Sequence, residues 1–479
     1  MNLVSDIVYW IVVVLFVYTI AMIIFAILLE NRNPLKSIAW VLVLVLLPFV
    51  GLVIYVLFGQ DFRRRKIISK KSIKKFSRPA HSDFDFKAFF KDETLPVENQ
   101  KLVSLLYNSA EAYPYTNSKV KILTTGCETF DSLFYDIEQA QNHIHLEFYI
   151  IQDDEVGNRL RQLLIRKAEA GVRVRVIYDY VGGFDLSKSY IQSLRDAGVY
   201  IQPFLPLKKS IGFSKMNYRN HRKIVIIDGV IGYTGGLNIA DRYLNGNKLG
   251  LWRDTQIRIE GSAVRGLQRV FLIDWFFVDN KIITHPKYFP TVSPSANNNL
   301  VQIVGSGPDS DWKTIMQGVV SIIAGASQYV YIHTPYLIPT ESVLTAMQTA
   351  ALSGIDVRVM LPEKSDTWLV TLASNSYLQQ LLESGVRVFM YQHNFLHSKA
   401  IVADDRVSTI GTANMDVRSY EHNFEINAFV FDEKVATTLK RHFLKDSHSC
   451  VEIKLDVWKS RKRIDRFKES FARLFSPLI

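Results

Sequence analysis

The sequence predicts an α/β protein with two similar domains, whose mixed or parallel sheets are related by a pseudo-twofold axis, behind an N-terminal two-helix transmembrane hairpin. Two observations carry this expectation. One pattern of histidine, lysine and aspartate occurs twice, 176 residues apart, and two long apolar stretches lie within the first 58 residues. In chain order we expect a transmembrane hairpin (1–60), a basic juxtamembrane linker (61–105), a first domain (106–295), a second domain (296–455) and a basic amphipathic tail helix (456–479).

The hairpin is predicted from hydropathy and length. Residues 7–29 and 38–58 are almost wholly apolar, and stretches of 23 and 21 residues can cross a bilayer core as helices. Pro48 is tolerated inside a transmembrane helix. A cleaved signal peptide fits poorly, because no basic segment precedes Ile7 and no small-residue cleavage site follows the first stretch. A buried hairpin in a soluble protein would need apolar partners all round, so we expect two membrane spans.

Basic residues predict the orientation of the hairpin. Residues 61–78 hold nine Lys or Arg against Asp61 alone, whereas the loop between the spans holds only Arg32 and Lys36. By the positive-inside rule, the body of the protein faces the cytoplasm. We therefore expect a multi-pass protein of the inner (cytoplasmic) membrane. A polybasic segment beside a span also attracts anionic lipid.

The duplicated pattern is the strongest signal of function. The first copy consists of His221, Lys223, Asp228, Gly235 and Asn238, and the second of His397, Lys399, Asp404, Gly411 and Asn414. The offsets from His are 2, 7, 14 and 17 in both copies. A lone histidine is more often a structural residue, and one chance match is only mildly surprising in a chain of this length. Two matches with the same offsets are not chance.

Each copy has the residues of half a phosphoryl-transfer site. His and Lys are two apart, so on a strand both point to the same face, and Ile224–Ile227 and Ala400–Ala403 read as short buried strands. One imidazole can attack phosphorus near neutral pH while a second protonates the departing alkoxide. The two lysines and the two asparagines can neutralise and hydrogen-bond the phosphoryl oxygens. In the turns that follow, Gly236 stands where the second copy has Thr412, so the first half-site lacks a hydroxyl donor there.

Weaker similarity extends upstream of each motif. The segment that begins Glu169-Ala-Gly171-Val resembles the one that begins Leu352-Ser-Gly354-Ile, and Asp196-Ala-Gly198-Val resembles Glu383-Ser-Gly385-Val. We interpret these as transitions from a helix, through a glycine cap, to a β-branched strand. The repeat is therefore a whole domain of roughly 180 residues, with strands and helices in layers and a largely parallel sheet.

With these motifs the sequence is similar to the phospholipase D superfamily, in which two HxKxxxxD motifs build one site at a pseudo-twofold interface. The resemblance implies two phospholipase D-like domains and an acidic residue that orients each histidine. Asp254 follows His221 by 33 residues, and Glu425 follows His397 by 28. A carboxylate on the far ring nitrogen would fix the tautomer and stabilise the imidazolium. The alternative for each acid is a surface carboxylate on a strand edge.

Asp228 and Asp404 belong to the same signature, but they end the motif strands. We expect them to brace the structure rather than to do chemistry.

The distribution of charge argues against a nucleic-acid partner. Residues 61–78 and 459–475 contribute +8 and +5 to a net charge of +11, so the remaining body is close to −2. A nuclease would carry its basic charge along a groove in the body. In the tail, Ile464, Phe467, Phe471 and Leu474 fall on one helical face among basic residues, which predicts an interfacial helix. The alternative is a helix docked on the protein's own core.

The composition indicates neither a metal site nor a nucleotide cofactor. No CxxC, HExxH or acidic cluster offers a metal cage, and no Gly-rich nucleotide fingerprint is present. Cys127 and Cys450 are the only cysteines, so we expect no disulfide in a cytoplasmic body.

Over nearly its whole length the chain resembles the family of bacterial cardiolipin synthases of the phospholipase D type. Two spans, a short polar turn, a proline-bearing second span, both motifs and the basic tail carry this resemblance. It implies that one phosphatidylglycerol transfers its phosphatidyl group to a second, giving cardiolipin and glycerol through a phosphatidyl-histidine, with no cofactor. By analogy His221 is the nucleophile. The partners are phosphatidylglycerol and anionic membrane lipid, and a homo-oligomer is left open.

Three alternatives remain at this stage. A membrane-bound phospholipase D hydrolase would use the same residues with water as the acceptor. A phosphatidyltransferase for another alcohol, such as ethanolamine or an amino-acid hydroxyl, would differ only in its headgroup contacts. A non-catalytic membrane scaffold is disfavoured, because every motif residue is intact in both copies.

Overall fold

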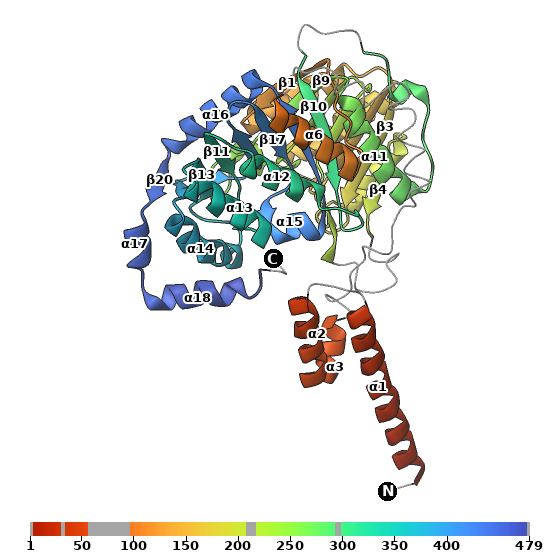
Figure 1. Cartoon of the computed structure of the whole chain (residues 1–479). Coiled ribbons are helices and arrows are strands. Elements are labelled where there is room, and N and C mark those ends of the chain that lie inside the picture. Colours follow the sequence, from red (N-terminus) through yellow and green to blue (C-terminus); the bar gives the residue numbers. More distant parts are fainter. Residues whose placement is uncertain (1–2, 30–33, 56–95, 207–216, 293–297, 477–479) are drawn as a thin grey trace. The chain divides into compact units, whose positions relative to one another are not determined.

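A computed structural model describes residues 3–29, 34–55, 96–206, 217–292 and 298–476 of the chain. The chain divides into two compact units, one of residues 1–64 and 206–218 and one of residues 65–205 and 219–479. The N-terminal unit holds three helices, α1 Leu3–Leu29, α2 Pro34–Leu46 and α3 Pro48–Ile54 (Figure 1). Among the described residues, α1 is the one helix long and apolar enough to span a membrane, with its core at Ser5–Phe25. The first predicted span is therefore confirmed as a helix.

The second predicted span is not one continuous helix, and that expectation is wrong in this respect. The chain leaves helical geometry at Leu47, with φ −129° and ψ 65°, and restarts with Pro48 as the first residue of α3. Proline lacks a backbone N–H and restricts the residue before it, which explains the break. The segment still packs on α1, since the rings of Phe16 and Phe49 stack at 4.2 Å. The basic stretch 61–78 lies outside the described residues.

The larger unit contains two halves with the same order of elements. The first half runs through β1 Ser118–Leu123, α7 Gly126–Glu138, β2 His143–Phe148, α8 Glu155–Glu169, β3 Arg173–Asp179, α9 Lys188–Asp196, β4 Tyr200–Phe204, β5 Arg219–Asn220, β6 Ile224–Ile227, β7 Ile231–Gly235, α10 Arg242–Asn245, β8 Trp252–Arg253, β9 Gln256–Gly261 and α11 Val264–Asp279. A short 3-10 helix, Pro286–Tyr288, follows it.

The second half repeats this plan with additions at its end. It runs through β10 Leu300–Ser306, α12 Thr314–Ala324, β11 Tyr329–His333, β12 Leu337–Ile338, α13 Glu341–Leu352, β13 Asp356–Pro362, α14 Trp368–Glu383, β14 Arg387–Tyr391, β15 Phe395–Leu396, β16 Ala400–Ala403, β17 Val407–Gly411, β18 Met415–Asp416, α15 Val417–Glu421, β19 Asn423–Phe431, α16 Glu433–Ser447 and β20 Cys450–Ile453. The tail forms α17 Leu455–Lys459 and α18 Arg463–Arg473.

Each half is built on a mixed sheet. The strand order is β1-β9-β7-β6-β2-β3-β4 in the first half and β10-β19-β17-β16-β11-β13-β14-β20 in the second. Equivalent strands occupy equivalent places, so the duplication seen in the motifs extends to the fold. In each half the three strands that alternate with helices are parallel and the motif strands run antiparallel to their neighbours. The mixed sheet is confirmed, whereas the expectation of a largely parallel one is wrong, because the motif strand returns as a hairpin.

The predicted helix–glycine–strand transitions are confirmed in both halves. Gly171 and Gly354 follow α8 and α13 with φ of 90° and 89° and lead into the parallel strands β3 and β13. A Cβ at either position would meet nothing within 4 Å. Backbone conformation rather than crowding therefore favours glycine at these two caps.

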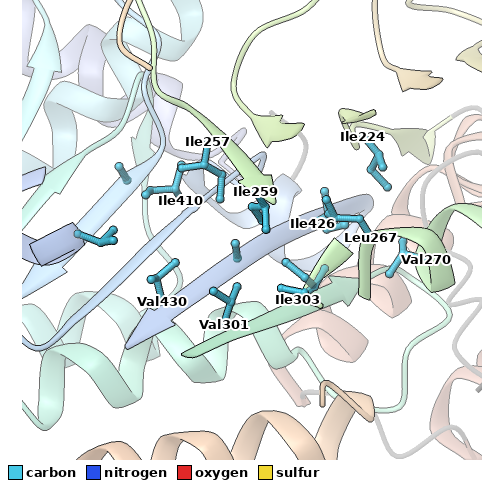
Figure 2. Close-up of a cluster of buried hydrophobic side chains, with 14 of the residues drawn as sticks. Ile224, Ile257, Ile259, Leu267, Val270, Val301, Ile303, Ile410, Ile426 and Val430 are labelled. Carbon is cyan, nitrogen blue, oxygen red and sulfur yellow. The ribbon is translucent and has the colours of Figure 1, made fainter. Parts of the chain in front are cut away.

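One apolar core joins the two halves. Figure 2 shows β-branched and leucine side chains of the first half, among them Ile257 and Ile259 of β9, facing Ile410 and Ile426 of β17 and β19. Strand β7 of the first half contacts β17 and β19 of the second, and α11 and α16 each contact strands of both halves. The two halves therefore share one core at their junction.

The expected boundary between linker and first domain does not match the packing. Helix α6, Val97–Ala110, crosses position 105 and packs against α12 and β10 of the second half. Its Leu102, Val103 and Leu106 are buried in the core of that half. The helix precedes the first half in sequence but packs on the second half. Local sequence does not encode this contact.

Candidate active site

The two motif histidines lie where a short strand of one half pairs with the other half. Strand β5, which precedes His221, pairs with β19, and the His221 amide donates to the Phe424 carbonyl at 2.9 Å. Strand β15, which precedes His397, pairs with β8, and the His397 amide donates to the Arg253 carbonyl at 2.8 Å. Each histidine is thereby anchored by its backbone to the opposite half.

This anchoring decides which carboxylate orients which histidine. The residue after each accepting carbonyl is an acid, and it contacts the imidazole of the same histidine. Glu425 lies 3.0 Å from Nδ1 of His221 through both carboxylate oxygens, and Asp254 lies 2.6 Å from Nδ1 of His397. The predicted orienting contacts are present, but they cross between the halves. The expected pairing of Asp254 with His221 and of Glu425 with His397 is therefore wrong.

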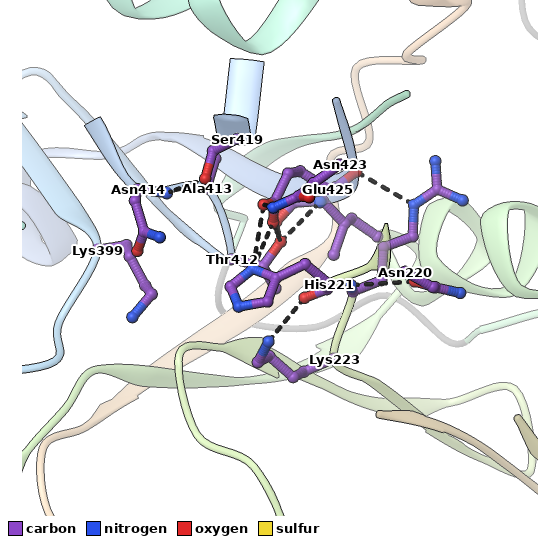
Figure 3. Close-up of polar contacts among 12 residues, drawn as sticks. Asn220, His221, Lys223, Lys399, Thr412, Ala413, Asn414, Ser419, Asn423 and Glu425 are labelled. Atoms are coloured by element: carbon purple, nitrogen blue, oxygen red, sulfur yellow. Dashed lines mark hydrogen bonds and ion pairs between the residues drawn. The ribbon is translucent and has the colours of Figure 1, made fainter. Parts of the chain in front are cut away.

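The contacts leave one nitrogen of each ring for chemistry. With Nδ1–H donated to a carboxylate, Nε2 carries the lone pair that can attack phosphorus or accept a proton. The side chain of His221 is 13% exposed and that of His397 is 9% exposed, while both carboxylates are fully buried. Figure 3 shows the His221 side, with Glu425 and Thr412 against one edge of the ring.

Both motif lysines are buried beside the histidines. Lys223 Nζ donates to the His221 carbonyl at 2.7 Å, and Lys399 Nζ donates to the His397 carbonyl at 2.5 Å. Burial lowers the pKa of Lys223 to about 7 and that of Lys399 to about 8. The charge of Lys399 adds to the shift of Lys223, whereas Asp254 and Glu425 oppose the shift of Lys399. Two buried ammonium groups in one place are costly in the free protein. Both are stabilised when an anion such as a phosphodiester binds between them.

The two histidine–carboxylate pairs are electrostatically unequal. Burial raises the pKa of Asp254 to about 6, although Lys399 and the Thr255 amide oppose it. Burial also acts on Glu425, but His221, Lys223 and the hydroxyl of Thr412 bring its pKa below the ordinary value. Burial lowers the pKa of His221, and burial together with Lys399 lowers that of His397 well below its ordinary value. A bound anion would oppose the lowering of the pKa of both imidazoles.

Thr412 contacts one of the orienting acids and Gly236 leaves room for the other. Thr412 Oγ1 donates to Glu425 at 2.5 Å and also accepts from the Ile426 amide at 2.9 Å. At the equivalent place, a Cβ on Gly236 would lie 2.1 Å from Oδ1 of Asp254. The first half uses glycine to make room for Asp254, and the Thr255 amide donates to that carboxylate at 2.7 Å.

Asp228 and Asp404 brace the motif strands, as expected. Asp228 accepts from the backbone amides of Gln141, Asn142 and His143 at 2.7–2.9 Å. Asp404 accepts from the equivalent amides of Ser327, Gln328 and Tyr329 at 2.7–2.9 Å. Each carboxylate ties the end of a motif strand to the start of the neighbouring strand, and a structural role stays the prediction for both.

The two motif asparagines differ in their contacts. Asn238 is tied to its own half, since its Oδ1 accepts from the Ile150 amide at 3.1 Å and its Nδ2 donates to the Tyr243 hydroxyl at 2.8 Å. By contrast, Oδ1 of Asn414 has no hydrogen-bond partner among the described residues. Their expected contact with phosphate stays a prediction.

The comparisons with known proteins agree with this geometry. The family model described as "Cardiolipin synthase, PLD-like domain" matches residues 133–262 and 319–447, and the model "Phospholipase_D-nuclease N-terminal" matches residues 14–60. The chain is 42% identical to cardiolipin synthase 2 of Bacillus anthracis, over 95% of this chain and 88% of that protein. It is 42% identical to a cardiolipin synthase of Oceanobacillus iheyensis, over 97% and 98% of the two chains. The chain belongs to the cardiolipin synthase family of the phospholipase D superfamily.

A solved structure supports the fold of this cardiolipin synthase family member independently. The chain is similar to phosphatidylserine synthase of Haemophilus influenzae, with a TM-score of 0.60 over 79% of this chain and 100% of that one, at 14% identity. At that identity the likeness concerns the fold alone.

Beneath the histidines lie two buried charged networks that the motifs did not reveal. Arg222 donates to the carbonyls of Glu425 and Ser306 and pairs with Asp274, so it links both halves under His221. Asn220 donates to Glu147 at 2.5 Å, and burial together with Asp274 raises the pKa of Glu147 well above its ordinary value. The available signal was the alternation His143-x-His145-x-Glu147 in a strand that is buried throughout.

The corresponding network under His397 uses different residues. Arg253 pairs with Asp446 at 2.9 Å, and His333 lies 3.4 Å from the same carboxylate. His333 occupies in β11 the place that Glu147 has in β2, as the register with Asp404 and Asp228 shows. The pseudo-twofold symmetry therefore holds for the backbone and the motif but not for the supporting charges.

Proposed function

We propose that this protein is a membrane-bound phosphatidyltransferase that makes cardiolipin and glycerol from two molecules of phosphatidylglycerol. The observation that carries the proposal is the pair of histidines from the two halves, each held by a carboxylate of the other half and backed by a buried lysine. A double displacement needs one nucleophile and one acid–base group on opposite sides of phosphorus, and this pair supplies them.

In the first step, Nε2 of His221 attacks the phosphodiester phosphorus of the donor lipid. The bond from phosphorus to the headgroup glycerol breaks, and His397 gives its proton to the departing glycerol oxygen. Lys223 and Lys399 offset the charge on the phosphoryl oxygens, and Glu425 stabilises the positive charge that develops on His221.

In the second step, His397 takes the proton from the terminal hydroxyl of a second phosphatidylglycerol. That oxygen attacks phosphorus, the bond from phosphorus to His221 breaks, and the enzyme returns to its starting state. One phosphodiester replaces another, so the exchange is nearly isoenergetic and needs no nucleotide. Exclusion of water from the phosphatidyl-histidine favours transfer over hydrolysis, and both rings are more than four-fifths buried.

The substrate class agrees with the membrane association of the chain. Helix α1 is long and apolar enough to cross a bilayer. We extend this to a multi-pass hairpin, with α2 and α3 completing the second crossing and the catalytic halves on the cytoplasmic side, because residues 61–78 are strongly basic. In a chain with Cys127 and Cys450 replaced by serine, a cysteine at 31–33 should react with an impermeant thiol reagent in intact cells, whereas a cysteine at Lys101 should not.

Incubation of the purified protein with phosphatidylglycerol alone tests the proposed reaction. Cardiolipin and glycerol should appear in equal amounts, and His221→Ala and His397→Ala should each abolish both, since nucleophile and acid act as one unit. A phosphohistidine should be trapped at position 221. Phosphatidic acid as the main product would identify a hydrolase instead, and more than a few per cent activity in either variant would contradict the shared site.

A further inference from the structure

The two sides of the active site differ in the loops that follow the parallel strands. Strands β11 and β13 are parallel, so the loops after them leave the same edge of the sheet, where ligands of α/β sheets usually bind. Tyr336 lies in the first of these loops and Asp366 in the second. The Tyr336 hydroxyl donates to both carboxylate oxygens of Asp366, at 2.9 and 3.0 Å.

This tyrosine–aspartate pair is connected to the second motif. The Tyr336 carbonyl accepts from the Thr334 hydroxyl at 2.7 Å, and the oxygen of that hydroxyl accepts from the Met415 amide at 3.1 Å. Met415 directly follows the motif residue Asn414. Strand β12, which begins after Tyr336, also pairs with β18, Met415–Asp416. The position of Tyr336 is therefore fixed relative to the motif loop.

Asp366 is close enough to His397 and Lys399 to act on both. Burial and Lys399 lower the pKa of His397, and the charge of Asp366 opposes that shift. Asp366 likewise opposes the effect of burial on the pKa of Lys399. The carboxylate is nevertheless exposed, and its protein donors are the hydroxyls of Tyr336 and Ser365. An ionised carboxylate has about four lone-pair positions, so acceptor capacity remains for a ligand hydroxyl.

The matching loops of the first half are occupied differently. Strand β3 ends in Asp179, whose carboxylate accepts from the backbone amides of Val181, Gly182 and Asn220. That carboxylate is buried and holds the chain in place. After β2 stands Tyr149, whose ring lies 5.2 Å from the His221 ring. Both histidines lie beside aromatic rings, since the Trp252 ring is 5.1 Å from that of His397. The sides differ in their carboxylates, because Asp179 is buried and bound to backbone amides whereas Asp366 is exposed.

We propose that Asp366, positioned by Tyr336, is the subsite for the glycerol hydroxyl next to the reacting oxygen. This inference rests on the proposed phosphatidyl transfer. In that reaction the departing glycerol and the incoming glycerol headgroup both use the His397 side, because the same histidine protonates one and deprotonates the other. Each carries a second hydroxyl on the neighbouring carbon. A carboxylate that accepts a hydrogen bond from that hydroxyl orients both alcohols, and a simple alcohol lacks the group.

The subsite predicts a preference for vicinal diols that depends on Asp366. Purified full-length protein is given vesicles of phosphatidylglycerol with labelled glycerol, 1-propanol or ethanolamine in the water phase, and the labelled or exchanged lipid is quantified. Wild type should prefer glycerol over 1-propanol. Asp366→Ala should reduce that preference about ten- to hundredfold, which is the effect of one lost hydrogen bond to a charged group. Tyr336→Phe should reduce the preference for glycerol less, because the Asp366 carboxylate remains and loses only the hydrogen bond from Tyr336.

Glu363→Gln is the matched control, since Glu363 is an exposed carboxylate three residues earlier in the same loop. It should leave the glycerol preference unchanged. An unchanged preference in Asp366→Ala, or an equal loss in Glu363→Gln, would overturn the subsite. A selective loss of ethanolamine transfer in Asp366→Ala would also overturn it, because the carboxylate would then recognise an ammonium group. A phosphohistidine trapped at position 397 would place both alcohols on the His221 side, and it would also overturn the subsite.

Failure of the subsite is distinguishable from failure of the proposed function. Cardiolipin formation by wild type from phosphatidylglycerol alone tests the function. The change in acceptor preference in the variants tests the subsite only.

Discussion

At the scale of single residues, the active site depends on carboxylates that reach across the junction of the halves. His221 and His397 were predictable because their role follows from a local pattern repeated with equal offsets. The partner of each was not, because it depends on two-residue strands that pair only in the folded protein. The buried support of Arg222, Asp274 and Glu147 was missed for the same reason, since its members are far apart in sequence.

The crossed pairing predicts different effects for the two acids. With an activated p-nitrophenyl ester of phosphatidic acid, formation of the phosphohistidine needs a nucleophile but no acid. Glu425→Gln should therefore slow the burst of nitrophenol, on the order of 10³–10⁴-fold as for an orienting triad carboxylate. Asp254→Asn should leave that burst nearly intact and slow the following transfer to alcohol. Stopped-flow measurement separates the steps, Asp131→Asn on the outer face of α7 is the control, and the reverse pattern would contradict the pairing.

The buried lysines predict the pH dependence of the reaction. The pKa of Lys223 is about 7 and that of Lys399 about 8 in the free protein, so both amines lose their charge as the pH rises through these values. Because kcat/KM reports the free enzyme, it should fall on this alkaline side. A bound phosphodiester raises the pKa of both amines, so the fall in kcat should occur at higher pH. A kcat/KM that keeps rising beyond the pKa of Lys399 would show that these charges are not needed.

At the scale of elements, each motif strand is held by the aspartate at its end. Asp228 and Asp404 lie in the left-handed region, with φ of 54° and 52°, and each accepts from three consecutive backbone amides at the start of the neighbouring strand, β2 or β11. The sequence predicted a bracing role because the residues end an apolar run. It did not predict the helix break at Leu47 or the attachment of α6 to the second half, which depend on backbone strain and on distant packing.

Removal of one brace should lower stability and leave the chemistry intact. Asp404→Ala loses hydrogen bonds from three amides to a buried carboxylate, which should lower the free energy of unfolding by about 2–4 kcal/mol. The pKa of Asp404 lies below its ordinary value, because the amides and Arg406 outweigh burial. The stabilisation of the fold by ionised Asp404 is thus complete above the ordinary carboxyl pKa. It is lost as the pH falls through the lowered pKa of Asp404 in the folded protein.

Thermal unfolding in detergent measures this effect as a function of pH. Asp405→Ala is the matched control, since that neighbouring carboxylate pairs with Lys440 at a half-exposed position and should matter less. Activity per folded molecule should persist in Asp404→Ala. Loss of activity without loss of stability would give Asp404 a chemical role.

At the scale of the whole molecule, the tail combines two predicted alternatives. Helix α18 lies along α14 at one edge of the larger unit (Figure 1). It docks through Ala472, which packs with Ala373 and Tyr377 of α14, while Arg473 lies over the Tyr377 ring at 4.2 Å. The face predicted from sequence is not the docked one, because Ile464, Phe467, Phe471 and Leu474 are 54–72% exposed. Helical periodicity identified the apolar face, but only tertiary packing shows what covers it.

We expect that exposed face of α18 to lie in the headgroup region of an anionic membrane. Apolar side chains gain by leaving water, and each basic residue near such a surface contributes ~1 kcal/mol of attraction. A spin label at Phe471→Cys in the full chain, with Cys127 and Cys450 replaced by serine, should be accessible to oxygen and shielded from a water-soluble nickel complex in anionic liposomes. A label at Arg466→Cys on the polar side of the helix should show the reverse, and both contrasts should weaken when Arg461, Lys462 and Arg463 are neutralised. Equal access of the nickel complex to both labels would mean that α18 faces water and that the net +5 charge of residues 459–475 is only solvated.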